Sequence, residues 1–131
     1  MKDQIQKLVN FIIWTRAGIQ MSEPAYGVYI ERKRDKVCAC IYGAAMLGGN
    51  KPDIGEGDDE KWIKENCGEF EVPDSMIDPR LSEYMSNEAY IHPNSIQTVM
   101  VAMNDSGVYT REEIVDWAEG TLLPWMEAQG E

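Results

Sequence analysis

The stretch VCACIYGAAMLGG, residues 37 to 49, constrains the fold most, because it combines small residues with a complete lack of charge. A helix without a polar face must be surrounded by other parts of the protein. The pair Gly48-Gly49 suits the end of such a helix, since glycine readily adopts the conformations found there. The sequence therefore predicts a helix over residues 37 to 48 in the middle of a helical bundle.

Further segments carry apolar residues at helical spacing and are expected to cover this central helix. A chain of 131 residues is long enough to form one domain with its own core. We therefore predict a mostly α, small single-domain helical bundle spanning residues 1 to 131. The covering helices are expected over residues 3 to 21, 95 to 104 and 111 to 123, with Pro124 kinking or dividing the last segment near Gly120.

Shorter elements are expected between these helices. Residues 26 to 40 alternate apolar and polar side chains around a charged turn, which is typical of a short β-hairpin. Residues 50 to 60, NKPDIGEGDDE, concentrate glycine, proline and acidic residues and are expected to form a solvated acidic loop. Short helices are predicted over residues 60 to 66 and 81 to 90.

The net charge of −11 is unevenly distributed along the chain. Residues 1 to 51 contain eight Lys and Arg against four Asp and Glu, whereas residues 52 to 131 contain four against nineteen. A surface this acidic repels phosphate backbones, so direct binding to nucleic acid is not expected. The charge suits a protein that binds a basic partner, or one that imitates DNA and so inhibits a DNA-binding protein.

The location of the protein is also indicated by the sequence. No run of about 18 apolar residues is present, so no membrane span is expected. The N-terminal residues lack the apolar core of a signal peptide. The cysteines, Cys38, Cys40 and Cys67, form an odd set that cannot pair completely, which fits a reducing compartment. We expect a cytoplasmic protein.

The segment NDSGVYTREE, residues 104 to 113, partly matches a calcium-binding loop. With Gly107 in the sixth position, Glu113 falls in the twelfth, but the first falls on Ala102, which offers no side-chain oxygen. Thr110 and Glu113 also fit a capping box, in which each side chain accepts a hydrogen bond from the other residue's amide. The sequence therefore favours a turn and a capped helix over a calcium site.

A second set of candidate ligands consists of Cys38, Cys40, Cys67 and His92, which together supply the donors of a Cys₃His zinc site. The C-x-C spacing is shorter than that of the usual zinc knuckle, and buried thiols that pack like apolar residues explain the same cysteines. A small metal-binding protein or enzyme that uses these four residues remains an alternative. No catalytic residue and no cofactor is assigned.

The basic cluster formed by Arg32, Lys33, Arg34 and Lys36 opposes the charge of the rest of the chain. It is interpreted either as the solvated tip of the hairpin or as a docking element for the acidic half of the same or a neighbouring chain. Such an attraction would be electrostatic and weakened by salt.

The segments VCACIYGAAMLGG and VMVAMNDSGVYTREEIVDWAE, residues 37 to 49 and 99 to 119, resemble a family of small, uncharacterised bacterial and phage helical proteins. At Cys40-Ile-Tyr the sequence departs from the Leu-Gly-Ala that this family tends to have, and its long acidic centre also differs. The resemblance implies a small helical domain of phage or prophage origin, and it carries no catalytic residues.

The leading hypothesis for function is a non-enzymatic acidic interaction protein that binds another protein or itself, for example as a homodimer. It depends on the charge pattern and on the lack of a recognisable nucleotide-binding loop or nucleophile with its base. The metal or enzyme reading of the cysteines and the DNA-mimic reading stand as alternatives.

Overall fold

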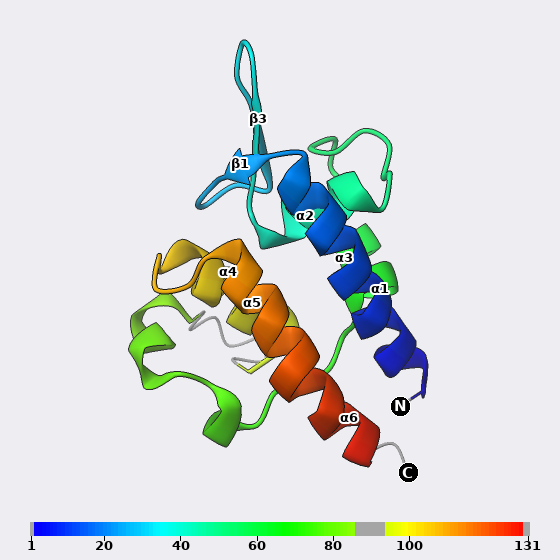
Figure 1. Cartoon of the computed structure of the whole chain (residues 1–131), viewed down its shortest axis with the longest axis vertical. Helices are drawn as coiled ribbons and strands as arrows, with labels where there is room; N and C mark the ends of the chain where they lie inside the picture. Colours follow the sequence, from blue (N-terminus) through cyan, green and yellow to red (C-terminus); the bar gives the residue numbers. More distant parts are fainter. Residues whose placement is uncertain (1, 86–93, 130–131) are drawn as a thin grey trace.

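The protein is mostly helical and carries a small mixed β-sheet, as Figure 1 shows, so the predicted fold class is confirmed. The computed structural model describes residues 2 to 85 and 94 to 129. No helix among these residues is long and apolar enough to cross a membrane. The α-helices are α1 (Lys2–Gln20), α2 (Ile41–Gly48), α3 (Asp59–Cys67), α4 (Ile96–Asp105), α5 (Arg111–Trp117) and α6 (Leu123–Gln129). The strands are β1 (Glu23–Pro24), β2 (Ile30–Arg32) and β3 (Val37–Ala39). Shorter helical turns are the 3₁₀ turns η1 (Asp74–Met76) and η2 (Pro79–Tyr84) and the π turn η3 (Ala118–Leu122).

Helix α2 is enclosed by other parts of the protein, as its small uncharged side chains predict. All residues from Ile41 to Met46 are buried. Helix α1 packs on it with backbone against backbone, since a Cβ atom added to Gly18 would lie 1.7 Å from the carbonyl oxygen of Ala44. The same holds at Gly48, where an added Cβ would lie 1.8 Å from the carbonyl oxygen of Trp14. Small residues at this crossing therefore allow the two helices to touch.

The start predicted for this helix, residue 37, is wrong by four residues. Val37–Ala39 is strand β3, which pairs antiparallel with β2 and parallel with β1. The hairpin predicted within residues 26 to 40 is thus confirmed, whereas the parallel partner β1 was not predicted. Strand pairing satisfies the backbone of residues 37 to 39, and Cys40 then caps α2 by accepting a hydrogen bond from the amide of Gly43 at 3.4 Å.

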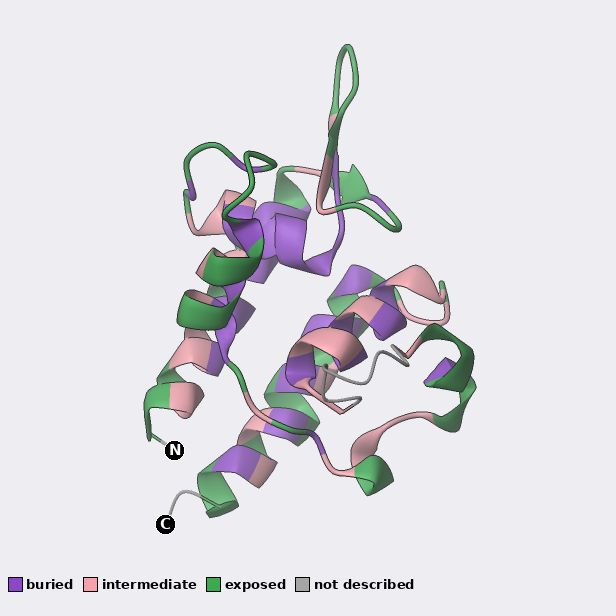
Figure 2. Ribbon diagram, turned by 180° about the vertical axis from the view of Figure 1, so that it is seen from behind, coloured by how far each residue is buried: buried purple, intermediate pink, exposed green. Residues whose placement is uncertain are grey.

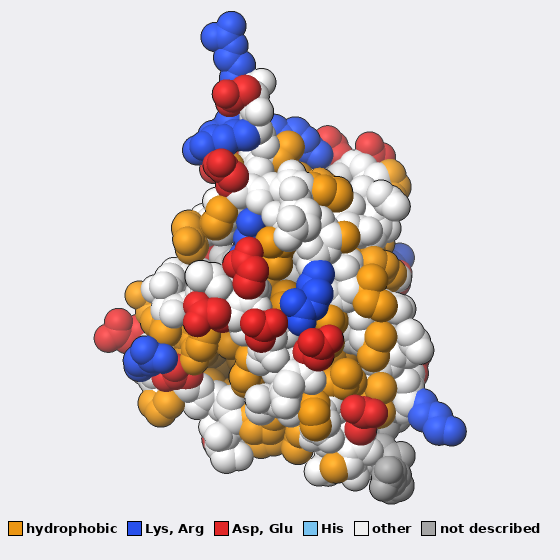
Figure 3. All heavy atoms as spheres, in the orientation of Figure 1, with side chains coloured by type: hydrophobic (Ala, Val, Ile, Leu, Met, Phe, Trp, Pro, Cys, Tyr) orange, Lys and Arg blue, Asp and Glu red, His pale blue; other side chains and the backbone are white. Residues whose placement is uncertain are grey.

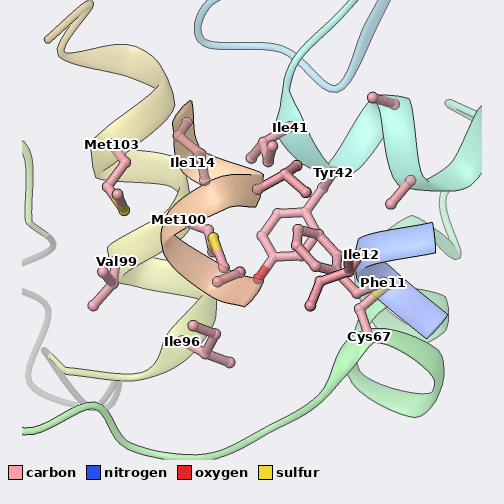
Figure 4. Close-up of a cluster of buried hydrophobic side chains, with 14 of the residues drawn as sticks. Phe11, Ile12, Ile41, Tyr42, Cys67, Ile96, Val99, Met100, Met103 and Ile114 are labelled. Carbon is pink, nitrogen blue, oxygen red and sulfur yellow. The ribbon is translucent and has the colours of Figure 1, made fainter. Parts of the chain in front are cut away.

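The core joins α1, α2, α4 and α5 around Tyr42, whose ring centroid lies 5.5 Å from that of Phe11 (Figure 4). Helix α4 contributes the apolar face predicted from its sequence, and Ser95 caps its start by accepting from the amide of Thr98. On the other side of α1, Trp14 contacts Trp62 of α3 with ring centroids 5.5 Å apart. The buried face of α4 consists of Ile96, Val99, Met100, Ala102 and Met103, together with Asn104.

The last helical segment continues further than residue 123. Because Pro124 has no amide hydrogen, the carbonyl of Gly120 cannot have its usual α-helical partner. The chain adapts through the π turn η3, in which the amide of Leu123 bonds to the carbonyl of Ala118. Helices α5 and α6 consequently form one run, visible in orange and red in Figure 1, that reaches Gln129.

The segment between α3 and α4 is less regular than predicted. Of the helix expected over residues 81 to 90, the structure contains a 3₁₀ turn that ends at Tyr84. Residues 86 to 90 lie outside the described part of the chain, as does His92.

Candidate functional site

A cavity of about 210 Å³ lies at the base of the β2–β3 hairpin, between the end of α4 and the start of α2. Most of its lining is apolar or backbone, and its acidic group is the carboxylate of Asp105. Two exposed side chains stand on the segment that forms its rim, Tyr26 with 60% and Val28 with 48% of its surface accessible. The lining residues are Gly27, Val28, Tyr29, Cys40, Ile41, Val101, Asn104 and Asp105.

Asn104 fixes one wall of this cavity and is 3% exposed. Its Oδ1 accepts a hydrogen bond from the amide of Ile41 at 3.0 Å, and its Nδ2 donates to the carbonyl of Ala25 at 2.9 Å. The Ile41 amide belongs to the first turn of α2 and has no partner within its own helix. One side chain thus joins α4, α2 and the segment after β1.

Asp105 presents a carboxylate of which one oxygen is fixed. Its Oδ1 accepts from the amide of Gly27 at 2.9 Å and from Nδ2 of Asn104 at 3.0 Å. Gly27 has φ +76°, a conformation that favours glycine and turns its amide toward this acceptor. Within the described part of the chain, Oδ2 has no hydrogen-bond partner, so the cavity offers a negatively charged acceptor.

Arg111 anchors the neighbouring start of α5 and is itself buried, with 5% exposed. Its guanidinium donates to the carbonyl of Ser22 at 2.8 Å, to the hydroxyl of Ser22 at 2.8 Å and to the carbonyl of Ala39 at 3.1 Å. Burial lowers the pKa of this guanidinium. These bonds to neutral acceptors tie the segment after α1 and strand β3 to the start of α5.

The three cysteines predicted as candidate ligands are free and buried. Cys38 lies in β3, Cys40 caps α2 and Cys67 ends α3. Burial raises the pKa of Cys40 to about 11 and that of Cys67 to about 12, so both thiols are protonated at neutral pH. Among residues 2 to 85 and 94 to 129, no group of three His, Cys, Asp or Glu side chains is placed to hold a metal ion. His92, the fourth candidate, lies outside those ranges.

Residues 104 to 113 form a turn followed by a capped helix. Thr110 Oγ1 accepts from the amide of Glu113 at 3.1 Å, and Glu113 Oε1 accepts from the amide of Thr110 at 2.9 Å, which is the expected capping box. Ala102, at the first position of the rejected calcium loop, is buried in α4. The side-chain oxygen of Asn104, at the third position, is bonded to Ile41 instead.

The acidic loop over residues 50 to 60 is not simply solvated, which corrects the sequence prediction. The Lys51 side chain is 2% exposed, and its ammonium lies 2.7 Å from Oδ1 of Asp58 and 3.0 Å from Oδ1 of Asp59. Oδ2 of Asp59 accepts from the amide of Gly55 at 2.8 Å, and Ile54 is buried. An internal lysine thus organises this loop, and the signal in the sequence was a lone lysine among its acidic residues.

The basic cluster Arg32, Lys33, Arg34 and Lys36 lies at the end of the β2–β3 hairpin. This hairpin extends away from the helices, and its residues 31 to 36 are exposed (Figure 2). Figure 3 shows Lys and Arg side chains at its tip. Lys36 pairs with Glu23 at 2.8 Å and Lys33 lies 3.9 Å from Glu31, while Arg34 has no ion pair or hydrogen bond with any described residue. The tip is therefore the largest exposed group of positive charge near the cavity.

Comparison with family models, with curated proteins and with solved structures found no match to this chain.

Proposed function

We propose that the protein is a non-enzymatic interaction module that docks its β2–β3 hairpin on an acidic protein surface. The observation that carries this proposal is the placement of the basic cluster. In a chain with a net charge of −11, four cationic residues stand within five positions at the end of an exposed hairpin.

The ion pairs made by Lys33 and Lys36 leave their charge available to a partner. The Lys36 and Glu23 side chains are 44% and 59% exposed, and the Lys33 and Glu31 side chains are 48% and 54% exposed. Exposed pairs of this kind contribute little, so a partner can displace them at small cost. Arg34 is available without displacing any such contact, and its planar guanidinium suits paired hydrogen bonds to a carboxylate.

The cysteines support this reading over an enzyme that uses them. A cysteine nucleophile acts as thiolate, whereas the raised pKa values of Cys40 and Cys67 keep both protonated at neutral pH. The positive charge of the hairpin tip also favours docking over DNA mimicry, since a DNA mimic presents negative charge throughout its contact surface.

Photo-crosslinking from the hairpin tip tests the proposal. The photoreactive residue p-benzoylphenylalanine replaces Asp35 at the tip, which leaves the basic cluster intact, or Glu65 on α3 as a matched acidic control. We expect a specific adduct with an acidic surface, identified by mass spectrometry after irradiation of cells of the source organism, from position 35 and not from position 65.

A second comparison establishes that the charge of the tip is responsible. Lys33→Glu with Arg34→Glu should abolish the adduct, whereas Lys61→Glu with Lys64→Glu on α3 makes the same change in net charge and should preserve it. The proposal fails if position 35 gives no adduct, or if the tip double variant leaves the adduct unchanged.

A further inference from the structure

The cavity at the base of the hairpin has the chemistry of a receptor for a cationic side chain. Its walls include Val28, Ile41 and Val101 together with Asp105, whose Oδ2 has no hydrogen-bond partner among the described residues. Lysine and arginine side chains lay their aliphatic stems along apolar surface while the charged head reaches a polar group.

The size of the cavity agrees with a side chain rather than a larger ligand. Pockets that bind drug-sized molecules typically measure about 300 to 1,000 Å³. At about 210 Å³ this cavity is smaller. It therefore suits one long side chain that enters from a partner protein.

The basic cluster at the hairpin tip offers such side chains, but they cannot reach the cavity of the chain that carries them. Tyr29 and Cys40 line the cavity and close the base of the hairpin, where the Cys40 amide bonds to the Tyr29 carbonyl at 3.1 Å. At the tip, the backbone amide of Lys33 donates to the backbone carbonyl of Lys36 at 2.9 Å. Four residues of extended chain separate base and tip by about 13 Å, so the tip points away from the cavity.

A second copy of the chain removes this obstacle. If two hairpins lie side by side in opposite directions about a two-fold axis, each tip meets the other copy's cavity, and both contacts form at once. Strand β2 is at the edge of its sheet, in the order β1-β3-β2, so it leaves room for a neighbouring hairpin.

We infer that the cavity beside Asp105 binds the cationic hairpin tip of a second copy of this protein, with Arg34 or Lys33 as the inserted residue. This inference rests on the proposed function and names its partner. The attraction is local, between a positive tip and a negative cavity, and it acts against the repulsion between two chains that each carry −11.

Sedimentation velocity and native mass spectrometry of the purified full chain test the inference with paired variants. Asp105→Asn removes the charge of the cavity while its Oδ1 can still accept from Gly27. Lys33→Glu with Arg34→Glu removes the charge of the tip. Each should raise the dimer Kd by about tenfold or more, as expected for loss of a partly buried charge pair. Val101→Phe, which fills the cavity, should do the same, whereas Lys61→Glu with Lys64→Glu should leave Kd within about twofold of wild type.

Mixing the two impaired proteins separates recognition from loss of folding. The Asp105→Asn protein keeps a functional tip and the tip double variant keeps a functional cavity, so one of the two contacts is restored in a mixed dimer. At equal concentrations, random association gives twice as much mixed dimer as either homodimer, and we expect mixed dimers well above that proportion in the mass spectrum.

A wild-type protein that stays monomeric throughout the micromolar range overturns the inference, and so does a dimer whose Kd all three variants leave unchanged. A mixture in which mixed dimers do not exceed the statistical proportion overturns it as well. The proposed function is judged separately. An adduct between position 35 and a different protein would uphold docking by the hairpin while refuting a second copy as the partner.

Discussion

The side chain of Asn104, near the end of α4, accepts a hydrogen bond from the backbone amide of Ile41, the first residue of α2, at 3.0 Å. The same side chain donates to the carbonyl of Ala25. The three segments joined in this way are distant in the sequence, yet they form the walls and the rim of one cavity. The candidate site therefore depends on a residue whose first role is structural.

Replacing Asn104 by alanine should destabilise the protein strongly. The substitution leaves the Ile41 amide and the Ala25 carbonyl buried without partners, and each such group costs roughly 1 to 3 kcal/mol. We expect a loss of about 3 kcal/mol in the free energy of unfolding, measured by urea titration. Asn66→Ala is the control, because among the described residues Asn66 donates to Trp62 in its own helix and to no other group, and it should change stability by about 0.5 kcal/mol or less. Equal losses in both variants would contradict this account.

Gly18 provides a test of the close contact between α1 and α2. A Cβ atom there would lie 1.7 Å from the Ala44 carbonyl oxygen, so Gly18→Ala forces the two helices apart. Overpacking of this kind costs about 1 to 3 kcal/mol. Gly120→Ala is the matched substitution, since an added Cβ meets no described atom within 4 Å outside its own helical segment, and it should be neutral or stabilise by up to about 1 kcal/mol. Thermal unfolding of the two variants distinguishes them, and a Gly18→Ala protein as stable as wild type would refute the close crossing.

The features that the sequence predicts well are those decided by neighbouring residues. The cap at Ser95 and the capping box at Thr110 depend on side chains within three positions of the amides they bind. The apolar face of α4 is likewise a local periodicity. By contrast, residues 37 to 39 fell within both the predicted hairpin and the predicted helix, and they form strand β3 because β1 and β2 pair with them. Pairing with distant strands decides there between two local interpretations.

The residues that build the candidate site depend on contacts over long distances. Asn104 resembles an ordinary turn residue in the sequence, and Arg111 resembles the single basic residue of an acidic helix. Their roles follow from partners 63 to 89 positions away. Lys51 is similar in kind, because its burial is set by how the loop folds over it. Pattern alone does not indicate which polar residues the fold will enclose.

Lys51 should be necessary for the folded form of residues 50 to 60. Lys51→Met keeps the aliphatic stem but leaves Asp59, 5% exposed, as a buried carboxylate without its cation. We expect a clear fall in the urea midpoint and faster amide exchange in this loop. Lys61→Met serves as control, since Lys61 is 77% exposed and lies 3.9 Å from Glu65, and its midpoint should stay near that of wild type. Unchanged amide exchange in the Lys51 variant would show that the ion pairs do not organise the loop.

Thr110→Ala should lower stability by about 1 kcal/mol, because it removes the acceptor for the Glu113 amide at the start of α5. Thr121→Ala alters an exposed threonine within η3 and should have an effect of about 0.5 kcal/mol or less. Chemical denaturation of both proteins gives the comparison. A Thr110 variant with wild-type stability would mean that the capping box contributes nothing measurable.

Asp78 should make part of the stability dependent on pH. Its carboxylate accepts from the Arg80 side chain at 2.6 Å and from the hydroxyl of Tyr109 at 2.5 Å, and these bonds, Arg80 first, lower its pKa below the ordinary value. A carboxyl group whose pKa is lower in the folded state stabilises that state fully above its unfolded pKa, about 3.9, and loses this contribution as the pH falls further.

The corresponding experiment compares wild type with Asp78→Asn in urea titrations between pH 8 and pH 2. The difference in unfolding free energy should be constant from pH 8 to about pH 5 and should narrow below about pH 4, where protonation removes the advantage of the carboxylate. Tyr109→Phe deletes one donor and keeps Arg80, so the pH-dependent part should become smaller without disappearing. A difference that stays constant down to pH 2 would show that Asp78 is not stabilised as a carboxylate, and the link between η2 and the α4–α5 turn would then be neutral hydrogen bonding alone.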